Sequence, residues 1–214
     1  MFEFNLKITP KILLVLHLTL GFLVAHPDFS IGQDTNAVTG PVKVMSELKL
    51  LKKGVLIVRL ESNQRKITAL EQMVEQEGVT LKQQEKLQKQ LEDTRNKTRN
   101  QIEGYLSGFK KNYHFSDVVF MYDYQTPEYK KGLITFFDVD RNQVSGSEVL
   151  SRHCVILSQG TSDFNRAKVL EFMTSDLKRL GKPAPKSHFG VFSFFTSTDV
   201  RILRLNKKLE ALTL

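Results

Sequence analysis

Apolar residues occur along the chain in short runs, which one long charged stretch interrupts. The run 54–60 is almost continuous in Val, Leu and Ile, and such a run is typical of a strand covered on both faces of a sheet. Its one charged residue, Arg59, is expected near the end of that strand, where it is solvated or paired. Further strands are expected at four places in the chain: 115–122, 133–137, 152–158 and 188–195.

The charged stretch 61–112 is rich in Glu, Gln, Lys and Leu and predicts two helices. Gly78 suits the end of the first helix, and Thr80 followed by Gln83 forms a capping box that predicts the start of the second. The apolar positions of the first helix share one face: Ile67, Leu70 and Val74. We therefore expect two antiparallel helices joined by a short turn.

The second helix carries one inward stripe at spacings of three or four residues: Leu87, Leu91, Thr94, Thr98, Ile102, Tyr105 and Phe109. The composition of this region is typical of a coiled coil. Thr94 and Thr98, however, stand where a tight coiled coil needs Leu or Ile. The stripe instead predicts a hairpin whose tip projects into solvent and whose base packs on the sheet.

Two more helices are expected in the later half of the chain. The first spans 164–180 and has five inward positions: Val169, Phe172, Met173, Leu177 and Leu180. The second starts at Thr198 or Asp199, with Val200, Leu203 and Leu209 inward. The sequence thus predicts an α/β fold. It has a single domain at 46–214, a mixed sheet of about five strands with flanking helices, and the hairpin 61–112 projecting between the first two strands.

Residues 1–32 have the layout of a secretory signal peptide. Lys7 and Lys11 form a basic start, 12–25 is apolar, and the small residues Ser30 and Gly32 favour cleavage after Gly32. Cleavage after Ala25 is the alternative. The apolar run is shorter than the roughly 20 residues that span a bilayer. We therefore expect an exported protein, periplasmic or secreted, with a flexible leader at 33–45 and no transmembrane segment once the signal is removed.

The chain has a formal net charge of +8 and a sequence pI of about 9.5. Such an excess favours anionic neighbours, which include lipid headgroups, acidic glycans and nucleic acid, but it also serves solubility alone. The basic residues of the last helix are the candidates for contact with an anionic surface: Arg201, Arg204, Lys207 and Lys208. Positive charge near a helix C-terminus also simply favours the helix dipole. An envelope protein or an anionic surface is the expected partner, and nucleic acid is disfavoured.

Cys154 is the single cysteine, so the chain has no internal disulfide and no cysteine-rich zinc site. His153 and Cys154 adjoin, but alternation along a strand places them on opposite faces, which argues against a catalytic pair. The sequence contains no Cys-x-x-Cys pair, phosphate-binding glycine loop, Gly-x-Ser-x-Gly elbow or His-Glu-x-x-His pair. No cofactor and no metal are expected.

Asp138, Asp140 and Asn142 resemble the start of an EF-hand calcium loop. The match fails because Gln143 occupies the position of the required Gly and Val149 that of the bidentate Glu. This acidic segment is therefore interpreted as a turn that ends a strand.

Three functions remain open from the residues alone. The first is a non-catalytic binding or interaction protein that uses the projecting hairpin. The second is a hydrolase-type enzyme of flavodoxin-like or thioredoxin-like architecture, with Asp123, Asp138 or His188 at strand ends as catalytic candidates. The third is a polyanion-binding protein that uses the basic C-terminal helix.

Three segments resemble a family of exported Bacteroidetes proteins of unassigned function. They are the strand 51–60 (Leu-Lys-Lys-Gly-Val-Leu-Ile-Val-Arg-Leu), the stretch 109–115 (Phe-Lys-Lys-Asn-Tyr-His-Phe) and the closing 204–209 (Arg-Leu-Asn-Lys-Lys-Leu). Members of that family often carry Cys-Pro where this chain has Ser116-Asp117, so no role of that cysteine carries over. The resemblance implies export and an α/β domain and implies no activity.

Overall fold

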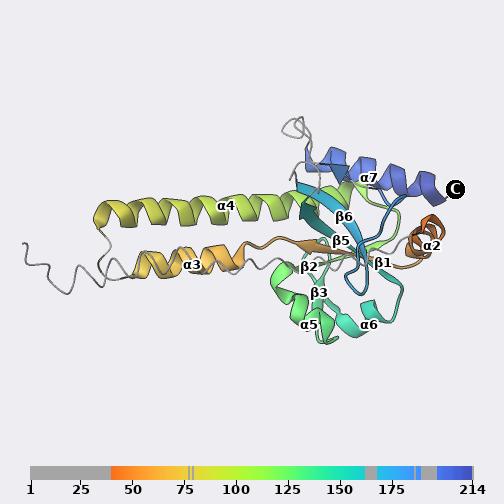
Figure 1. The fold of residues 1–214 in the computed structure, drawn as a ribbon, viewed down its shortest axis with the longest axis horizontal. Helices are drawn as coiled ribbons and strands as arrows, with labels where there is room; N and C mark the ends of the chain where they lie inside the picture. Colours follow the sequence, from red (N-terminus) through yellow and green to blue (C-terminus); the bar gives the residue numbers. More distant parts are fainter. Residues whose placement is uncertain are drawn as a thin grey trace, which may run out of the picture. The chain divides into compact units, whose positions relative to one another are not determined.

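A computed structural model describes residues 40–76, 78, 80–161, 168–185, 187–188 and 197–213. The described residues all belong to one compact unit. Its described strands form a single mixed sheet in the order β4-β3-β2-β1-β5-β6-β7, and helices flank that sheet (Figure 1). The predicted α/β class is therefore confirmed, with seven strands in place of about five.

The centre of the sheet is β1 (Val55–Leu60), which runs parallel to β2 (Asp117–Tyr122) on one side and to β5 (Cys154–Thr161) on the other. Five of the six residues of β1 are buried, and only Arg59 is partly exposed. This burial on both faces is what the continuous apolar run predicts.

The remaining strands pair in antiparallel fashion at the two edges. On one side β3 (Thr135–Phe137) pairs with β2 and with the polar strand β4 (Gln143–Ser145), which the sequence analysis missed. On the other side β6 (Lys168–Thr174) pairs with β5, and β7 (Ser187–His188) pairs with β6. The predicted strand 188–195 thus begins as expected at His188, and 189–195 lies outside the described residues.

The helix predicted at 164–180 is wrong, because its middle forms the strand β6. Four consecutive residues there are buried, Val169 to Phe172, with exposures between 1% and 3%. A helix on a sheet surface buries one face only, whereas a strand packed on both faces buries every residue. Antiparallel pairing with β5 from Val155 to Thr161 therefore outweighs the helical spacing of the apolar residues.

Two layers of helices cover the sheet. One face carries α4 (Leu81–Asn112), α7 (Thr198–Thr213) and α2 (Pro41–Leu51), which share one apolar cluster with β1, β2, β5 and β6. The other face carries the short helices α5 (Thr126–Lys130) and α6 (Gly146–Leu150), whose Tyr129 and Val149 join a second cluster. A 3-10 turn, η1 (Asp123–Gln125), links β2 to α5.

The predicted hairpin between the first two strands is confirmed. It consists of α3 (Gln64–Glu75) and α4, which run side by side away from the sheet (Figure 1). Thr80 forms the predicted capping box with Gln83, and the turn contains Gly78 at φ +87°. At 32 residues, α4 is about 48 Å long at a rise of 1.5 Å per residue. The α4 residues that join the core cluster with the sheet all lie in its C-terminal third: Ile102, Tyr105, Leu106 and Phe109.

The N-terminal predictions are only partly covered by the described residues. The signal peptide 1–32 lies outside them, and α2 begins at Pro41, so residues 41–45 of the predicted leader are helical. Among the described helices, none combines the length and the apolar character needed to cross a bilayer. In α7 the predicted inward residue Leu209 is buried, but Val200 and Leu203 are each 38% exposed, and Ile202 and Leu205 are buried instead.

Candidate functional site

The carboxyl ends of β1, β2 and β5 lie next to one another at the same end of the sheet, because the three strands are parallel. The chain first adds β2 on one side of β1 and later adds β5 on the other side. In open α/β sheets, ligands bind outside the carboxyl ends of the strands near such a reversal of strand order.

Asp123 lies at these carboxyl ends, where it links the segments that follow β1 and β2. Its Oδ1 accepts hydrogen bonds from the Ser62 backbone N–H (3.0 Å), the Ser62 hydroxyl (2.5 Å) and the Tyr124 N–H (3.1 Å). Desolvation by burial lowers the pKa of Arg59, and the nearby Asp123 carboxylate partly offsets this by raising it. Asp123 is thus a carboxylate close enough to Arg59 for its charge to act on the guanidinium.

A groove opens beside this junction, between α3, α4, the end of β2 and the turn that precedes β4. Its volume is about 490 Å³. The residues that line it are Gln64, Ile67, Glu71, Arg95, Thr98, Arg99, Ile102, Glu103, Tyr122 and Arg141. We call it the α3–α4 groove. A hydrogen bond from Asn63 Nδ2 to Thr98 Oγ1 (2.9 Å) ties the start of α3 to α4 at its base.

Five charged side chains line the groove, and four of them are paired. Arg95 Nη2 lies 2.6 Å from Glu71 Oε1, which bridges α4 to α3. Arg141 pairs with Glu103, which bridges the turn before β4 to α4. Within the described part of the chain, Arg99 makes no ion pair and no side-chain hydrogen bond. The groove therefore carries one uncompensated positive charge between two neutral pairs.

One aromatic residue, Tyr122, lines the groove at its sheet end. The Tyr122 and Tyr124 rings stack at a centroid distance of 5.4 Å and an interplanar angle of 9°. Tyr122 also contacts the Phe137 ring at 5.1 Å, which fixes it against β3. Tyr124 is not among the lining residues, but its ring stacks on one of them and is 52% exposed.

The structure does not bring the three catalytic candidates together. Asp138 follows β3 and accepts hydrogen bonds from Asp140 N–H (2.8 Å), Asn142 N–H (2.9 Å) and Asn142 Nδ2 (2.9 Å), which makes the predicted turn. His188 lies in β7, four strand positions from the β2 that leads into Asp123, or about 19 Å at ~4.8 Å per strand. The His188 side chain lies outside the described part of the structure.

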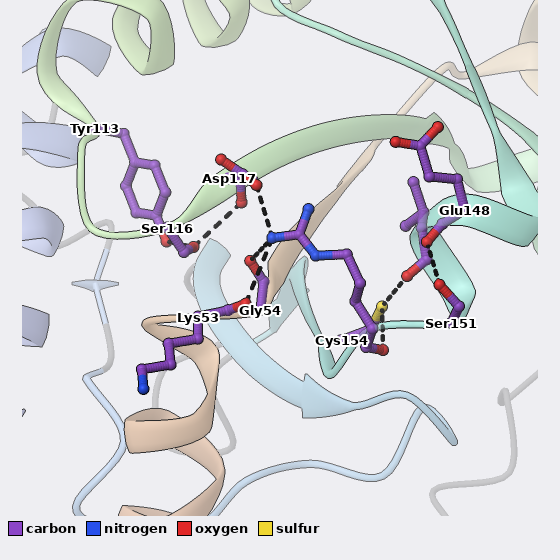
Figure 2. Close-up of polar contacts among 10 residues, drawn as sticks. Lys53, Gly54, Tyr113, Ser116, Asp117, Glu148, Ser151 and Cys154 are labelled. Atoms are coloured by element: carbon purple, nitrogen blue, oxygen red, sulfur yellow. Dashed lines mark hydrogen bonds and ion pairs between the residues drawn. The ribbon is translucent and has the colours of Figure 1, made fainter.

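Arg152 links the strands at the opposite end of the sheet, where β1, β2 and β5 begin. Its Nη2 lies 2.7 Å from Asp117 Oδ2 and donates to the carbonyl oxygens of Lys53 (3.4 Å) and Gly54 (3.2 Å), as Figure 2 shows for these three partners. Cys154 is buried beside it, and its Sγ donates to the Val149 carbonyl at 3.2 Å. These contacts connect the starts of β1, β2 and β5 and fit a structural role.

The predicted anion contacts on α7 differ in exposure. Arg204, Lys207 and Lys208 are exposed, whereas Arg201 is half-buried and desolvation lowers its pKa. Among the described residues, no cluster of His, Cys, Asp and Glu has the arrangement of a metal site.

The groove residues were not among the sequence candidates. Arg95, Arg99 and Glu103 follow one another at intervals of four, which places them on one face of a helix and was a usable signal. Nothing in the sequence indicates that Arg141, 38 residues further on than Glu103, contacts that face. No protein-family model, no curated protein and no solved structure matches this chain.

Proposed function

We propose that the protein is a non-catalytic binding protein that holds an acidic segment of a partner protein in the α3–α4 groove. The observation that carries this proposal is the charge pattern around Arg99. A carboxylate placed between the Arg95–Glu71 and Arg141–Glu103 pairs gains Arg99 as a partner without displacing either pair. Charge-assisted hydrogen bonds from arginine to carboxylate are among the stronger polar contacts in proteins.

An extended partner suits the groove better than a small metabolite. Small-molecule sites usually enclose most of the ligand surface. This groove runs between two helices and is open to solvent, so it would leave much of a small ligand exposed. A polypeptide can follow its length, place an acidic side chain at Arg99 and rest on the exposed Tyr124 ring.

A non-catalytic role is also supported by how the acidic candidates are used. Asp123 Oδ1 already accepts three hydrogen bonds that join two strand ends. Both carboxylate oxygens of Asp138 accept hydrogen bonds within its own turn. Asp123 Oδ1 and both carboxylate oxygens of Asp138 thus already have structural partners, which favours a structural role over that of a general base.

We further propose that the protein acts outside the cytoplasm, in the cell envelope or exterior. The basic start, apolar run and small residues of 1–32 support this. The mass of the mature chain tests it, and we expect a product that begins at Gln33. A product that retains Met1 would contradict the proposal.

The binding test uses a fluorescein-labelled oligo-glutamate peptide and an oligo-glutamine peptide of equal length. We expect the fluorescence anisotropy to rise when the protein is added to the first peptide and to stay unchanged with the second. Arg99→Glu should weaken binding at least about tenfold, because it places a like charge at the contact. Lys97→Glu is the matched control: it changes the net charge equally, is exposed on the same helix and does not line the groove. Equal losses in the two variants would refute the groove and leave only non-specific attraction.

A further inference from the structure

The outer faces of α2 and α7 form a second surface that the groove does not explain. The two helices contact each other, and each buries an apolar stripe in the same core cluster. In α2 this stripe is Val44, Leu48 and Leu51, and in α7 it is Ile202, Leu205 and Leu209. Most of the residues between these positions are exposed, and Asn206 is a buried exception.

Apolar side chains stand on these outward faces. Val42 is 85% exposed, Leu50 is 53% exposed and Leu203 is 38% exposed. Each belongs to a helix whose inner face is already well packed, so the domain core gains nothing from them. Exposed apolar side chains among basic ones are typical of helices that lie in the interface of a membrane.

Basic side chains surround these apolar ones. The exposed cations of this surface are Lys43, Lys49, Lys52, Arg204, Lys207 and Lys208. The same helices carry three acidic groups, and each has a partner. Glu47 lies 3.4 Å from His153 Nε2, Asp199 Oδ2 lies 3.8 Å from Lys111 Nζ, and Glu210 Oε1 accepts a hydrogen bond from Asn206 Nδ2 at 2.8 Å. The surface is therefore positive, with apolar side chains among its lysines.

We propose that the outer faces of α2 and α7 dock the protein on the surface of an anionic lipid bilayer. Basic residues near such a surface are attracted to its headgroups, and apolar side chains among them enter the boundary of the acyl chains. A soluble polyanion would match the lysines and would leave Val42, Leu50 and Leu203 without a partner. The combination of both side-chain types is what favours lipid.

Docking of this kind leaves the groove accessible. α2 lies at the end of the sheet where β1 begins, and the α3–α4 hairpin extends from the end where β1 finishes (Figure 1). None of the residues of this surface lines the groove. The docking proposal does not depend on the function proposed for the groove.

The test measures co-sedimentation of the full chain with vesicles of phosphatidylcholine alone and of equal parts phosphatidylcholine and phosphatidylglycerol. We expect binding to the anionic vesicles only. The double variant Lys207→Glu/Lys208→Glu should weaken it at least about thirtyfold. Lys86→Glu/Lys89→Glu on the exposed outer part of α4 is the matched control, with the same change in charge and little expected effect. Any binding by residues 1–39 is common to both variants.

A second pair of variants separates lipid from soluble polyanion. Leu50→Gln/Leu203→Gln keeps every charge and should weaken vesicle binding several-fold while retention on immobilised heparin stays unchanged. Equal vesicle binding by this variant and the wild type would overturn insertion into the bilayer surface. Retention on heparin without binding to anionic vesicles would overturn the proposal in favour of a soluble polyanion. Equal losses in the α7 and α4 charge variants would show non-specific attraction only and would also overturn it.

Discussion

Replacing Asp123 by alanine should destabilise the domain strongly, because this residue joins the ends of β1 and β2. The substitution removes three hydrogen bonds and leaves the Ser62 N–H and hydroxyl without their acceptor at a site where Ser62 is only 8% exposed. Hydrogen bonds to charged groups contribute about 1.5–3 kcal/mol each, and water entering the vacated space offsets part of the loss. We expect a decrease of about 2–4 kcal/mol in the free energy of unfolding.

Urea unfolding followed by circular dichroism measures this change. With a slope of about 2 kcal/mol per molar urea, the midpoint should fall by about 1–2 M. Asp123→Asn is the control, since its amide oxygen can still accept from the Ser62 and Tyr124 N–H groups, and we expect a smaller loss. A change below about 0.5 kcal/mol for Asp123→Ala would refute the structural role and return Asp123 to the list of catalytic candidates.

Three further predictions follow from other contacts. Gly146→Ala should cost more than about 2 kcal/mol, because the added Cβ would lie 1.9 Å from the Ile134 carbonyl oxygen, and Ser147→Ala, one residue further on, should change the unfolding midpoint little. Burial raises the pKa of the Cys154 thiol, with a smaller opposing effect of Arg152, so iodoacetamide at pH 8 should modify it slowly in the folded chain and rapidly in urea; equal rates would contradict the buried site. Desolvation alone would raise the pKa of Asp138. Hydrogen bonds from Asn142 and Asp140 and the charge of Lys110 together outweigh this effect, so the pKa of Asp138 lies below its ordinary value. Its stabilisation is therefore present above the unfolded-state pKa and is lost as pH falls through the folded-state value, and Asp138→Asn should flatten the decline of thermal stability between about pH 5 and pH 2.

The hairpin could be predicted from the sequence because its signals are local. Thr80 and Gln83 form a capping box over four residues, and Gly78 supplies the positive φ of the turn. The polar stripe positions Thr94 and Thr98 are buried as expected, and the Thr94 hydroxyl is satisfied by donating to the Gln90 carbonyl at 2.7 Å. No distant contact is needed to specify these features.

The strand β6 could not be predicted in the same way. Its apolar residues have a spacing that fits a helix, and only antiparallel pairing with β5 selects the extended form. Short apolar runs are ambiguous between buried strand and helix for this reason. The polar strand β4 is similar: only its pairing with β3 identifies it as a strand.

The candidate site was the least predictable feature, because it assembles from three distant parts of the chain. Glu71 and Arg95 come from the two helices of the hairpin, and Arg141 comes from a turn beyond β3. The sequence indicated that the hairpin is charged and solvated. It did not indicate that the turn containing Arg141 packs against α4 and closes one end of a groove.

The measurement that tests the central claim most directly is site-specific photo-crosslinking of the groove to partners in envelope extracts. A photoreactive amino acid at Ile67, which lines the groove, is compared with one at Lys97 on the outer side of α4. We predict a discrete crosslinked product from position 67 that disappears when Arg99→Glu is added and that is absent from position 97. The same product from both positions, or a product from position 67 that survives Arg99→Glu, would contradict binding in the α3–α4 groove.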